Sequence, residues 1–532
     1  MSRRRRAGAV RTLLVTVGVA AAAGAQPAER TLTLEEAVAL ALRNAEGIVI
    51  ERESLLSAEA AVTGAEGAYD PLLGLEAGWS ESNPPLNSSF SGAPPGRLSP
   101  TTEISEARAT LDQLLPTGGT VSVRGAGDRA TTDGVFGLLS PAYGTQAGVE
   151  LRQPLLRNRA IDPARFRIRA AAADLDLATA DLQREVTDTV AAVEQAYWTL
   201  VAARREVGVR EEAMGLAEEQ LTETTARIET GMAPELEIAQ PRAERERRRG
   251  ELLASQEAAM RAENTLKLLV LGDHDSDLWD DRLQPSAVGE VAIAPVEVGA
   301  AMERALAARP ELAALQALVE RRRAEAALAR DAVRPALDAV VSYDRYGLAG
   351  TRNPASAPPP GVPSDVPPRL EGDLGQSFEL LRDGEFDDTR VALVFAIPIG
   401  NRAARAGAEI ARSAERQAEA ELTRLRKLVR TEVLDAVAVL ETAGQRIEAA
   451  RAAREAAEVQ LSSERDRYGA GMSTNFLVLT RQNDLSRARL EEIAAVTDYR
   501  RARTALARVT GALLEERGIA VEQPADPKEG QS

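Results

Sequence analysis

The fold is decided by the stretch VTDTVAAVEQAYWTLVAARREVGVREEAMGLAEEQLTETTARI, which occupies residues 186–228. Every seventh residue from Val186 to Ile228 is apolar, and no proline interrupts the run. Apolar heptads sustained over such a length are typical of coiled-coil packing. The spacing predicts one helix from about Pro163 to Thr230, on the order of 100 Å long at about 1.5 Å per residue.

The same plan occurs a second time in the chain. Apolar residues from Val433 to Tyr468 keep a matching heptad, which Arg454 breaks once. The motif Arg-x-x-x-Gly-Met ends both long helices, at Arg227 and at Arg467, an offset of 467 − 227 = 240. We therefore predict two internal repeats, each with a helix, strands, a long helix, a sharp turn and a returning helix. They occupy residues 32–272 and 298–511, with an equatorial linker at 273–297 and a disordered tail at 512–532.

A glycine follows each long helix and predicts where it ends. Gly231 and Gly471 can adopt the left-handed backbone conformation that stops a helix abruptly. The returning helices, at residues 235–271 and 475–510, are expected to pack back along the long ones. The chain would then form two coiled-coil helical hairpins with tight, similar turns.

Four segments alternate between apolar and polar residues, namely 72–79, 145–152, 337–344 and 390–397. Alternation over roughly 9–11 residues is typical of transmembrane β-strands, in which one face contacts lipid and the other contacts water. A further alternating pair lies near 104–113 and 119–125. It is either an external hairpin or two more barrel strands, and the pattern does not distinguish them.

About four membrane strands per protomer would leave open sheet edges in lipid, which is forbidden. The barrel is therefore expected to close by oligomerisation, and three protomers would give about 12 strands. The predicted fold class is α+β and mainly α, with the helical hairpins forming an α-barrel that continues a trimeric 12-stranded transmembrane β-barrel.

The N-terminus has the layout of a secretory signal peptide. Arg3–Arg6 precede a short apolar run, and Ala23-Gly24-Ala25 resembles an A-x-A cleavage site. We assign residues 1–25 to this signal, and the mature chain has no apolar run long enough to span a bilayer as a helix. The protein is therefore expected to be exported and to enter a membrane only through strands.

Composition excludes several functional classes. The chain has no cysteine and one histidine, so thiol nucleophiles, Cys-ligated zinc and the HExxH motif are impossible. The net charge of −16 argues against nucleic-acid binding. Residues 272–277 begin like a calcium loop, but Leu278 and Gln284 stand where glycine and glutamate are expected. We predict a solvated loop there, no catalytic, cofactor or metal site, and a protein that is not an enzyme.

Several short motifs recur in an order and spacing that resemble one family. They are Leu34-Glu35-Glu36-Ala37, Gln153-Pro154-Leu155-Leu156, Arg309-Pro310-Glu311-Leu312, Ile397-Pro398, Arg467-Tyr468-x-x-Gly471-x-Ser473 and Leu477-Val478-Leu479. Together they cover residues 32–512, and the chain resembles the TolC family of outer-membrane efflux proteins, or outer-membrane factors. The resemblance implies a homotrimeric duct that crosses the outer membrane, contacts its lipid and extends into the periplasm. The duct would serve a tripartite efflux pump or a type I secretion system.

The resemblance also implies two functions for the hairpin turns, or tips. A periplasmic adaptor (membrane fusion protein), linked to an inner-membrane transporter, would dock on Gly231, Met232, Ala233, Gly471, Met472 and Ser473. Arg227, Glu237, Arg467 and Tyr468 match positions that close the periplasmic gate. Leu477 and Thr480 stand where well-studied members have aspartates, so the family's acidic ring on the second tip is expected to be missing.

The competing hypothesis is a soluble periplasmic coiled-coil scaffold, similar to an adaptor. Adaptors also carry helical hairpins, but usually one, flanked by lipoyl-like β segments and often a membrane anchor. Two long hairpins with strand pairs at their far ends favour the channel. The sequence identifies neither the cargo nor the class of inner-membrane transporter.

Overall fold

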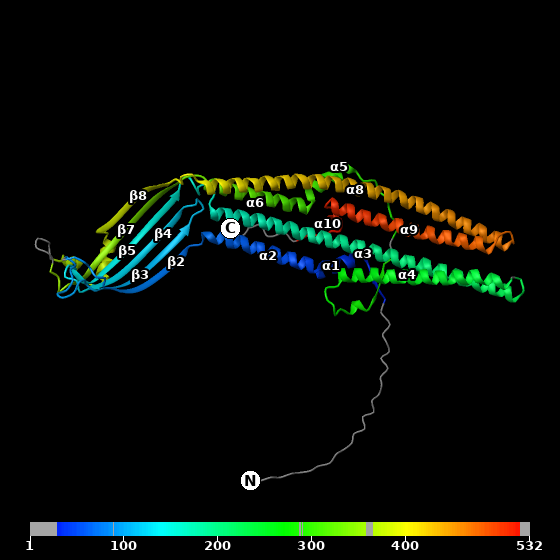
Figure 1. The fold of residues 1–532 in the computed structure, drawn as a ribbon, viewed down its shortest axis with the longest axis horizontal. Helices are drawn as coiled ribbons and strands as arrows, with labels where there is room; N and C mark the ends of the chain where they lie inside the picture. The colour runs from blue at the N-terminus through cyan, green and yellow to red at the C-terminus, as the bar shows by residue number, and fades with distance from the viewer. Residues whose placement is uncertain are drawn as a thin grey trace, which may run out of the picture. The chain divides into compact units, whose positions relative to one another are not determined.

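The computed structural model describes residues 29–88, 90–232, 234–286, 289, 291–357 and 365–521, and the predicted signal peptide lies outside these ranges. Figure 1 labels the helices and strands along the chain. The fold divides into two compact units. The first comprises the residues up to Ala45 with Ala192–Ala294 and Ala443–Arg501, and the second comprises Glu46–Ala191, Pro295–Thr442 and the residues from Ala502 on.

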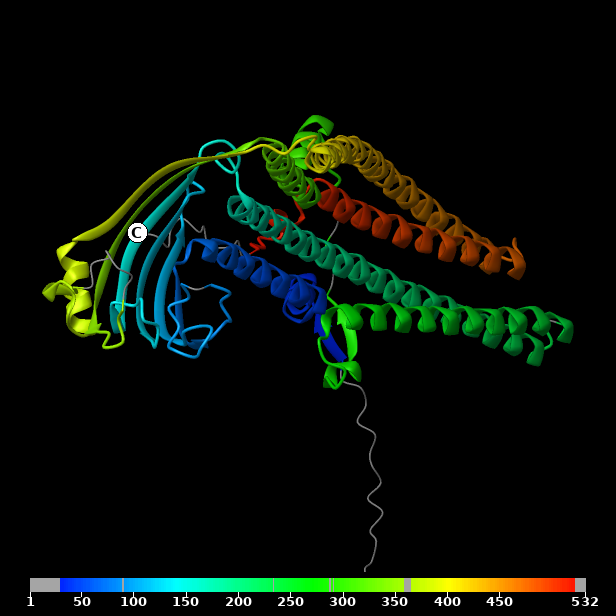
Figure 2. The same ribbon diagram turned by 60° about the vertical axis from the view of Figure 1, so that its left-hand side comes forward.

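The second unit contains a sheet of six strands in the order β2-β3-β4-β5-β7-β8, with every neighbouring pair antiparallel. Figure 2 shows its strong curvature. The strands are β2 (Leu72–Ser82), β3 (Thr102–Leu114), β4 (Thr120–Thr132), β5 (Leu139–Pro154), β7 (Ala336–Arg352) and β8 (Phe386–Ala396).

This sheet corrects the strand count predicted from the sequence. All four predicted strands are present, but β3 and β4 join the same sheet between β2 and β5. The described part of one protomer therefore supplies six strands to this sheet rather than about four. The alternative of two additional strands, which the sequence left open, is the one the fold adopts.

The strand register sorts the side chains of the sheet onto two different faces. Leu73, Leu111, Val123, Val149 and Tyr343 are successive partners in one row across five strands, so they share a face. The opposite face is polar. There Arg124 of β4 reaches over Gly148 of β5 to Asp344 of β7, with 2.8 Å between Nε and Oδ1. One apolar and one polar face is the pattern expected of barrel strands.

A short helix that the sequence did not predict, α7 (Leu374–Asp383), packs on β5 and β7 (Figure 2). Ser377 is fully buried, and the Thr145 hydroxyl lies 2.9 Å from the Ser377 hydroxyl. A Cβ at Gly347 would lie 1.9 Å from the Ser377 carbonyl oxygen, so only glycine allows this close approach.

Two long helices, α3 (Pro163–Glu229) and α8 (Arg402–Gly469), contribute residues to both units. Several predicted heptad positions are fully buried, among them Val193, Leu200, Val433 and Ile447, whereas Val207, Met214, Leu221 and Ile228 toward the first tip are half-buried. The coiled-coil prediction is thus confirmed. The second unit also holds α2 (Glu46–Glu66), α5 (Val298–Ala308) and α6 (Pro310–Ala332). No described helix is long and apolar enough to cross a membrane.

The Arg309 motif anchors the start of α6 in the second unit. The guanidinium of Arg309 is buried and pairs with Glu311 at 3.1 Å and with Glu432 at 2.5 Å. Burial opposes ionisation of Glu311, yet the hydrogen bond from Arg309 keeps the pKa of Glu311 below its ordinary value.

Parts of the predicted tail and linker form regular secondary structure. Residues 512–521 contain the helix α10 (Leu513–Glu516), whose Leu513 and Leu514 are buried. The chain turns at Gly511, a glycine with positive φ, and the rest of the predicted tail lies outside the described residues. In the linker, β6 (Arg282–Pro285) pairs in parallel with β1 (Glu29–Leu32).

The first unit also contains α1 (Leu34–Asn44), η3 (Asp277–Trp279), α4 (Ala239–Val270) and the residues up to Arg501 of α9 (Asn475–Val509), and α4 and α9 are the helices that return from the tips. A capping box between Thr33 and Glu36 starts α1. Asn44 then donates a hydrogen bond to the carbonyl of Val270 at the end of α4. This bond ties α1 to the end of α4 that lies away from the first tip.

Candidate functional site

The two helical hairpins end in turns with the same backbone geometry. After α3, Gly231 has φ +74°, and the N–H of Met232 donates to the carbonyl of Arg227 at 2.8 Å. After α8, Gly471 has φ +75°, and the N–H of Met472 donates to the carbonyl of Arg467 at 2.8 Å. In each turn the glycine N–H bonds the carbonyl three residues earlier. Both tips therefore end in a Schellman motif, as the glycines predicted.

The tips differ in how the next helix begins. The first tip continues through a short 3-10 helix, η2 (Glu235–Ile238), before α4. In the second tip α9 begins at Asn475, and the Ser473 hydroxyl bonds the carboxylate of Glu464. The two tips therefore share one turn geometry, but the segment that follows the turn differs between them.

The residues predicted for adaptor docking are open at both tips. Met232 is 69% exposed and Met472 is 73% exposed. A Cβ added at Gly231 or Gly471 would meet no other group within 4 Å. Ala233 lies outside the described residues. Each tip thus presents bare backbone beside a flexible apolar side chain, a surface that another chain can approach closely.

Two of the four predicted gate residues bond to each other across the hairpins. Nη1 of Arg227 donates to the hydroxyl of Tyr468 at 2.7 Å, and the guanidinium lies 5.8 Å from the centroid of the Tyr468 ring. The ring packs against a core cluster of the second hairpin formed by Ala457, Leu461, Val478, Leu485 and Ala488. Tyr468 is thus fixed by its own hairpin, while its hydroxyl holds the other one.

The other two predicted gate residues remain apart. Glu237 and Arg467 are both exposed, and neither forms a side-chain ion pair within the part of the chain that the structure describes. Leu477 and Thr480 occupy the second tip, as the sequence states, so no carboxylate stands at those two positions.

Sequence reasoning missed a second set of contacts between the hairpins. Arg489 of α9 pairs with Glu212 of α3 at 2.6 Å, and Arg247 of α4 donates to Asn483 of α9 at 3.1 Å. Charged residues flanking the heptad seam were the available signal, because such positions commonly form interhelical ion pairs. The spacing alone did not identify which charges meet.

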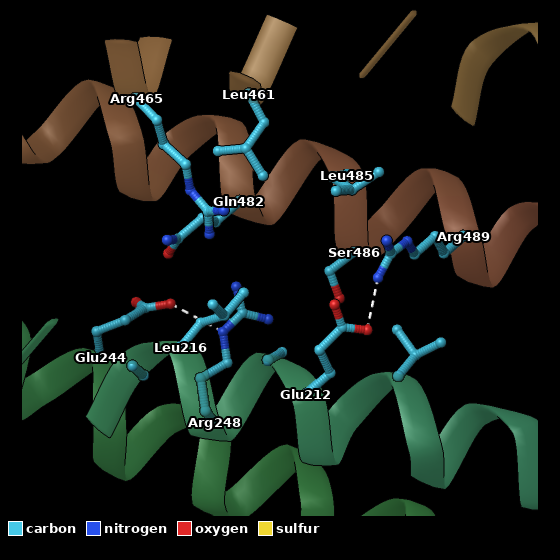
Figure 3. A pocket seen from close by; sticks show the side chains of 13 residues that line it. Glu212, Leu216, Glu244, Arg248, Leu461, Arg465, Gln482, Leu485, Ser486 and Arg489 are labelled. Carbon is cyan, nitrogen blue, oxygen red and sulfur yellow. Dashed lines mark hydrogen bonds and ion pairs between the residues drawn. The ribbon is translucent and has the colours of Figure 1, made fainter. Parts of the chain in front are cut away.

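A cavity of about 140 Å³ lies between the hairpins beside this ion pair (Figure 3). Arg248 lines it and is held by Glu244 at 2.9 Å. Ser486 also lines it, and its buried hydroxyl has no hydrogen-bond partner among the described residues. A space of this size and polarity suits a few ordered water molecules. The cavity indicates that the two hairpins are loosely packed beside the ion pair of Glu212 and Arg489.

Ion pairs also tie the second hairpin to itself. Arg454, which interrupts the heptad, pairs with Glu492 at 2.7 Å and Glu458 at 3.0 Å. The hydrogen bond to Glu458 raises the pKa of Arg454 above its ordinary value.

In the linker, Asp273, His274 and Asp275 form an exposed cluster on the loop that the sequence singled out.

Comparison with known proteins gives three findings. A family described as outer membrane efflux protein matches residues 105–271 and 301–512. No curated protein matches the chain. Several solved structures do, among them the outer-membrane channel CmeC of Campylobacter jejuni, with 16% identity, a TM-score of 0.61, and coverage of 93% of this chain and 88% of that one.

Two further structures have the same fold. The outer-membrane protein VceC of Vibrio cholerae is 17% identical, with a TM-score of 0.59 and coverage of 90% of this chain and 96% of that one. The open state of the MtrE channel of Neisseria gonorrhoeae is 15% identical, with a TM-score of 0.56 and coverage of 90% and 89%. Identities this low demonstrate the shared fold alone.

Proposed function

This chain belongs to the outer membrane efflux protein family, and from that premise we propose that three copies of it form an export duct gated at the hairpin tips. The protein is an outer-membrane efflux channel that extends into the periplasm. The proposal concerns its assembly, its gate and its partners.

Assembly is supported by the open edges of the sheet. Among the described strands of one copy, β2 and β8 each have a neighbour on one side only. Five antiparallel pairings separate them, so β2 and β8 run in opposite directions, and β8 of one copy can pair with β2 of the next. Unpaired strand edges cannot face lipid, which favours closure by further copies. The number three comes from the family resemblance.

The helices of the first unit also carry apolar side chains that one copy leaves uncovered. Leu253 and Met260 on α4 are seven residues apart and are 58% and 62% exposed. Val459 on α8 is 70% exposed. Apolar residues at heptad spacing normally face another helix, so we assign these positions to contacts between copies.

The gate is the bond between Arg227 and Tyr468, and this single observation carries the proposal. Among the described residues it is the hydrogen bond between the two hairpins that lies nearest to both turns, and one partner is charged, which makes such a bond stronger than a neutral one. We propose that it holds the closed arrangement. An adaptor that docks on Gly231, Met232, Ala233, Gly471, Met472 and Ser473 would favour hairpins that have moved apart.

The energy would come from an inner-membrane transporter linked to the adaptor, in a tripartite pump or a type I secretion system. The duct itself carries out no chemistry in this proposal. Its residues hold a path open or closed, and the transported molecule passes unchanged.

The test is membrane fractionation of the expressed protein, followed by the native mass of the detergent-extracted particle. Outer-membrane material with the mass of three chains is the expected result. A periplasmic monomer or dimer would overturn the trimeric duct and favour the coiled-coil scaffold.

A further inference from the structure

We infer that each copy places all six strands in the wall of the outer-membrane pore and that the hairpin of β3 and β4 determines the width of that pore. With three copies the wall has 3 × 6 = 18 strands. The total of 18 rests on the trimer proposed above, whereas the contribution of six strands per copy rests on the sheet itself.

The first argument is that the hairpin continues the sheet without any break. β2 pairs with β3 from Leu72 to Ser82, and β3 pairs with β4 over the full length of both strands. β4 then pairs with β5 as far as Ala130. The register has no shift in any of these three ladders, so β3 and β4 form regular central strands of the sheet.

The second argument comes from the faces of the inserted strands. On β3, Ala107, Ala109 and Leu111 lie on the apolar face of the sheet, whereas Arg108 and Asp112 lie on the polar face. Both strands contain 13 residues, more than the roughly 9–11 that a membrane requires. A hairpin standing outside the membrane would have no need for an apolar face in phase with the lipid face of its neighbours.

The third argument is that other strands are adapted to the presence of β4. Arg124 of β4 forms an ion pair with Asp344 of β7, although β5 lies between them. The contact is possible because the intervening residue is Gly148, where a Cβ would lie 1.9 Å from the Asp344 carboxylate. Asp344 is 3% exposed, and Gln146 of β5 also donates to it. A buried carboxylate needs such partners, so removing β4 would leave Asp344 without its cation.

The consequence concerns the cargo that the membrane part admits. The diameter of a barrel grows roughly in proportion to strand number, so 18 strands give a bore about 1.5-fold wider than 12 (18/12). Barrels of about 16–18 strands leave an open aqueous channel. The polar face that would line it carries both signs of charge, from Arg108 and Arg124 to Glu76 and Glu150. We therefore expect bulky hydrophilic molecules to pass this part, leaving selection to the hairpin tips.

Cysteine cross-linking distinguishes the two arrangements cleanly, because the natural chain has no cysteine. Leu73 is the partner of Leu111 on β3, and Val123 on β4 is the partner of Val149 on β5. If β3 and β4 stood outside the wall, β2 would pair with β5 instead. Because the two inserted strands keep the register, Leu73 would then oppose Val149.

The experiment compares three double variants oxidised in isolated outer membranes: Leu73→Cys with Leu111→Cys, Val123→Cys with Val149→Cys, and Leu73→Cys with Val149→Cys. Six strands per copy predict that the first two cross-link and the third does not. Cross-linking of the third pair, or failure of the first two at normal protein levels, would overturn the inference. Native mass is measured in parallel, so a correct strand order with a mass other than three chains would count against the trimer alone.

A second variant tests the width directly. Replacing residues 83–139 with an Asn-Gly turn removes β3 and β4 and places Ser82 opposite Ser140, which keeps the register in which Leu73 opposes Val149. We expect the largest polyethylene glycol that enters the pore from the outer face to be about 1.5-fold smaller in diameter than for the full chain. An unchanged size limit in a correctly inserted particle would contradict the proposed role of the hairpin.

Discussion

The two hairpin tips have the same backbone turn but carry different side chains. The turn is common to both repeats, whereas the hydrogen bond between the hairpins depends on a side chain that only one repeat has. Gly231 and Gly471 end their helices with matching φ angles and hydrogen bonds. At an offset of 240, however, Ile228 of the first tip corresponds to Tyr468 of the second. At this position, therefore, only the second tip can offer a hydroxyl to the other hairpin. The turn is a shared scaffold, and the bond between hairpins is a property of one copy.

The largest effect is expected where the tips are alike. Gly471→Glu places a bulky charge on the open backbone of the second tip, and we expect export to fall to the level of a strain lacking the channel. The same outcome is expected for Gly231→Glu. The left-handed conformation adds only about 1–2 kcal/mol of strain in each case, so trimer and membrane insertion should persist. Export is measured as drug accumulation in cells that have no other outer-membrane duct.

Gly469→Glu is the matched control, because this exposed glycine lies two residues away and ends α8 with no nearby group. It should export normally. Normal export by Gly231→Glu and Gly471→Glu at normal protein levels would count against docking at the tips.

The next effect concerns a difference between the returning helices. α4 exposes Leu253 and Met260, whereas the large apolar residues that α9 exposes, Phe476 and Leu477, lie next to the tip. We expect Met260→Glu to weaken contacts between copies by about 1.5–3 kcal/mol, the value of burying one such side chain. Native mass at decreasing protein concentration should show earlier loss of the trimer. Ala254→Glu, on another side of the same helix, should leave the trimer unchanged, and equal behaviour of the two variants would remove α4 from the interface.

The asymmetry of the gate predicts a change of similar free energy, seen in the opening frequency and not in the assembly. Tyr468→Phe keeps the ring packed but removes the acceptor for Arg227. A hydrogen bond to a charged group contributes about 1.5–3 kcal/mol, so the open arrangement should become at least about 10-fold more frequent. Single-channel recording in a planar bilayer measures this frequency. Tyr499→Phe is the control, since that hydroxyl bonds the carbonyl of Ala292 within the same unit and away from the tips. An unchanged opening frequency in Tyr468→Phe would remove the bond from the gate.

Local patterns predicted the parts of this molecule that depend on local physics. The heptads identified the long helices, and the glycines identified both turns, because period and backbone conformation are properties of short segments. The position of β3 and β4 in the sheet was not predictable in the same way. On the apolar face of β4, Gly125, Gly127 and Arg129 obscure the alternation. Strand order is also a long-range property that no single segment contains.

The candidate site was likewise predictable only in part, because its individual residues could be named from the sequence but their contacts could not. Arg227 and Tyr468 were named from the resemblance, but their bond joins residues 241 positions apart and required the fold. The pair of Glu212 and Arg489 is separated by 277 positions and lies among many similar charges on the same helices. For α7, the preceding loop gave no sign that Ser377 would pack over Gly347.

The smallest expected effect comes from that ion pair between Glu212 and Arg489. The side chain of Glu212 is 56% exposed and that of Arg489 is 29% exposed, so water and salt screen most of their attraction. We expect Glu212→Gln to cost about 0.2–1 kcal/mol of stability, measured as the thermal midpoint of the detergent-extracted particle. A double-mutant cycle with Arg489→Gln isolates the pair, and the coupling should shrink as salt rises. Arg489 also lies 3.6 Å from Glu458, which can partly replace the lost partner. A coupling above about 2 kcal/mol would mean that this pair, as well as Arg227 and Tyr468, holds the two hairpins together.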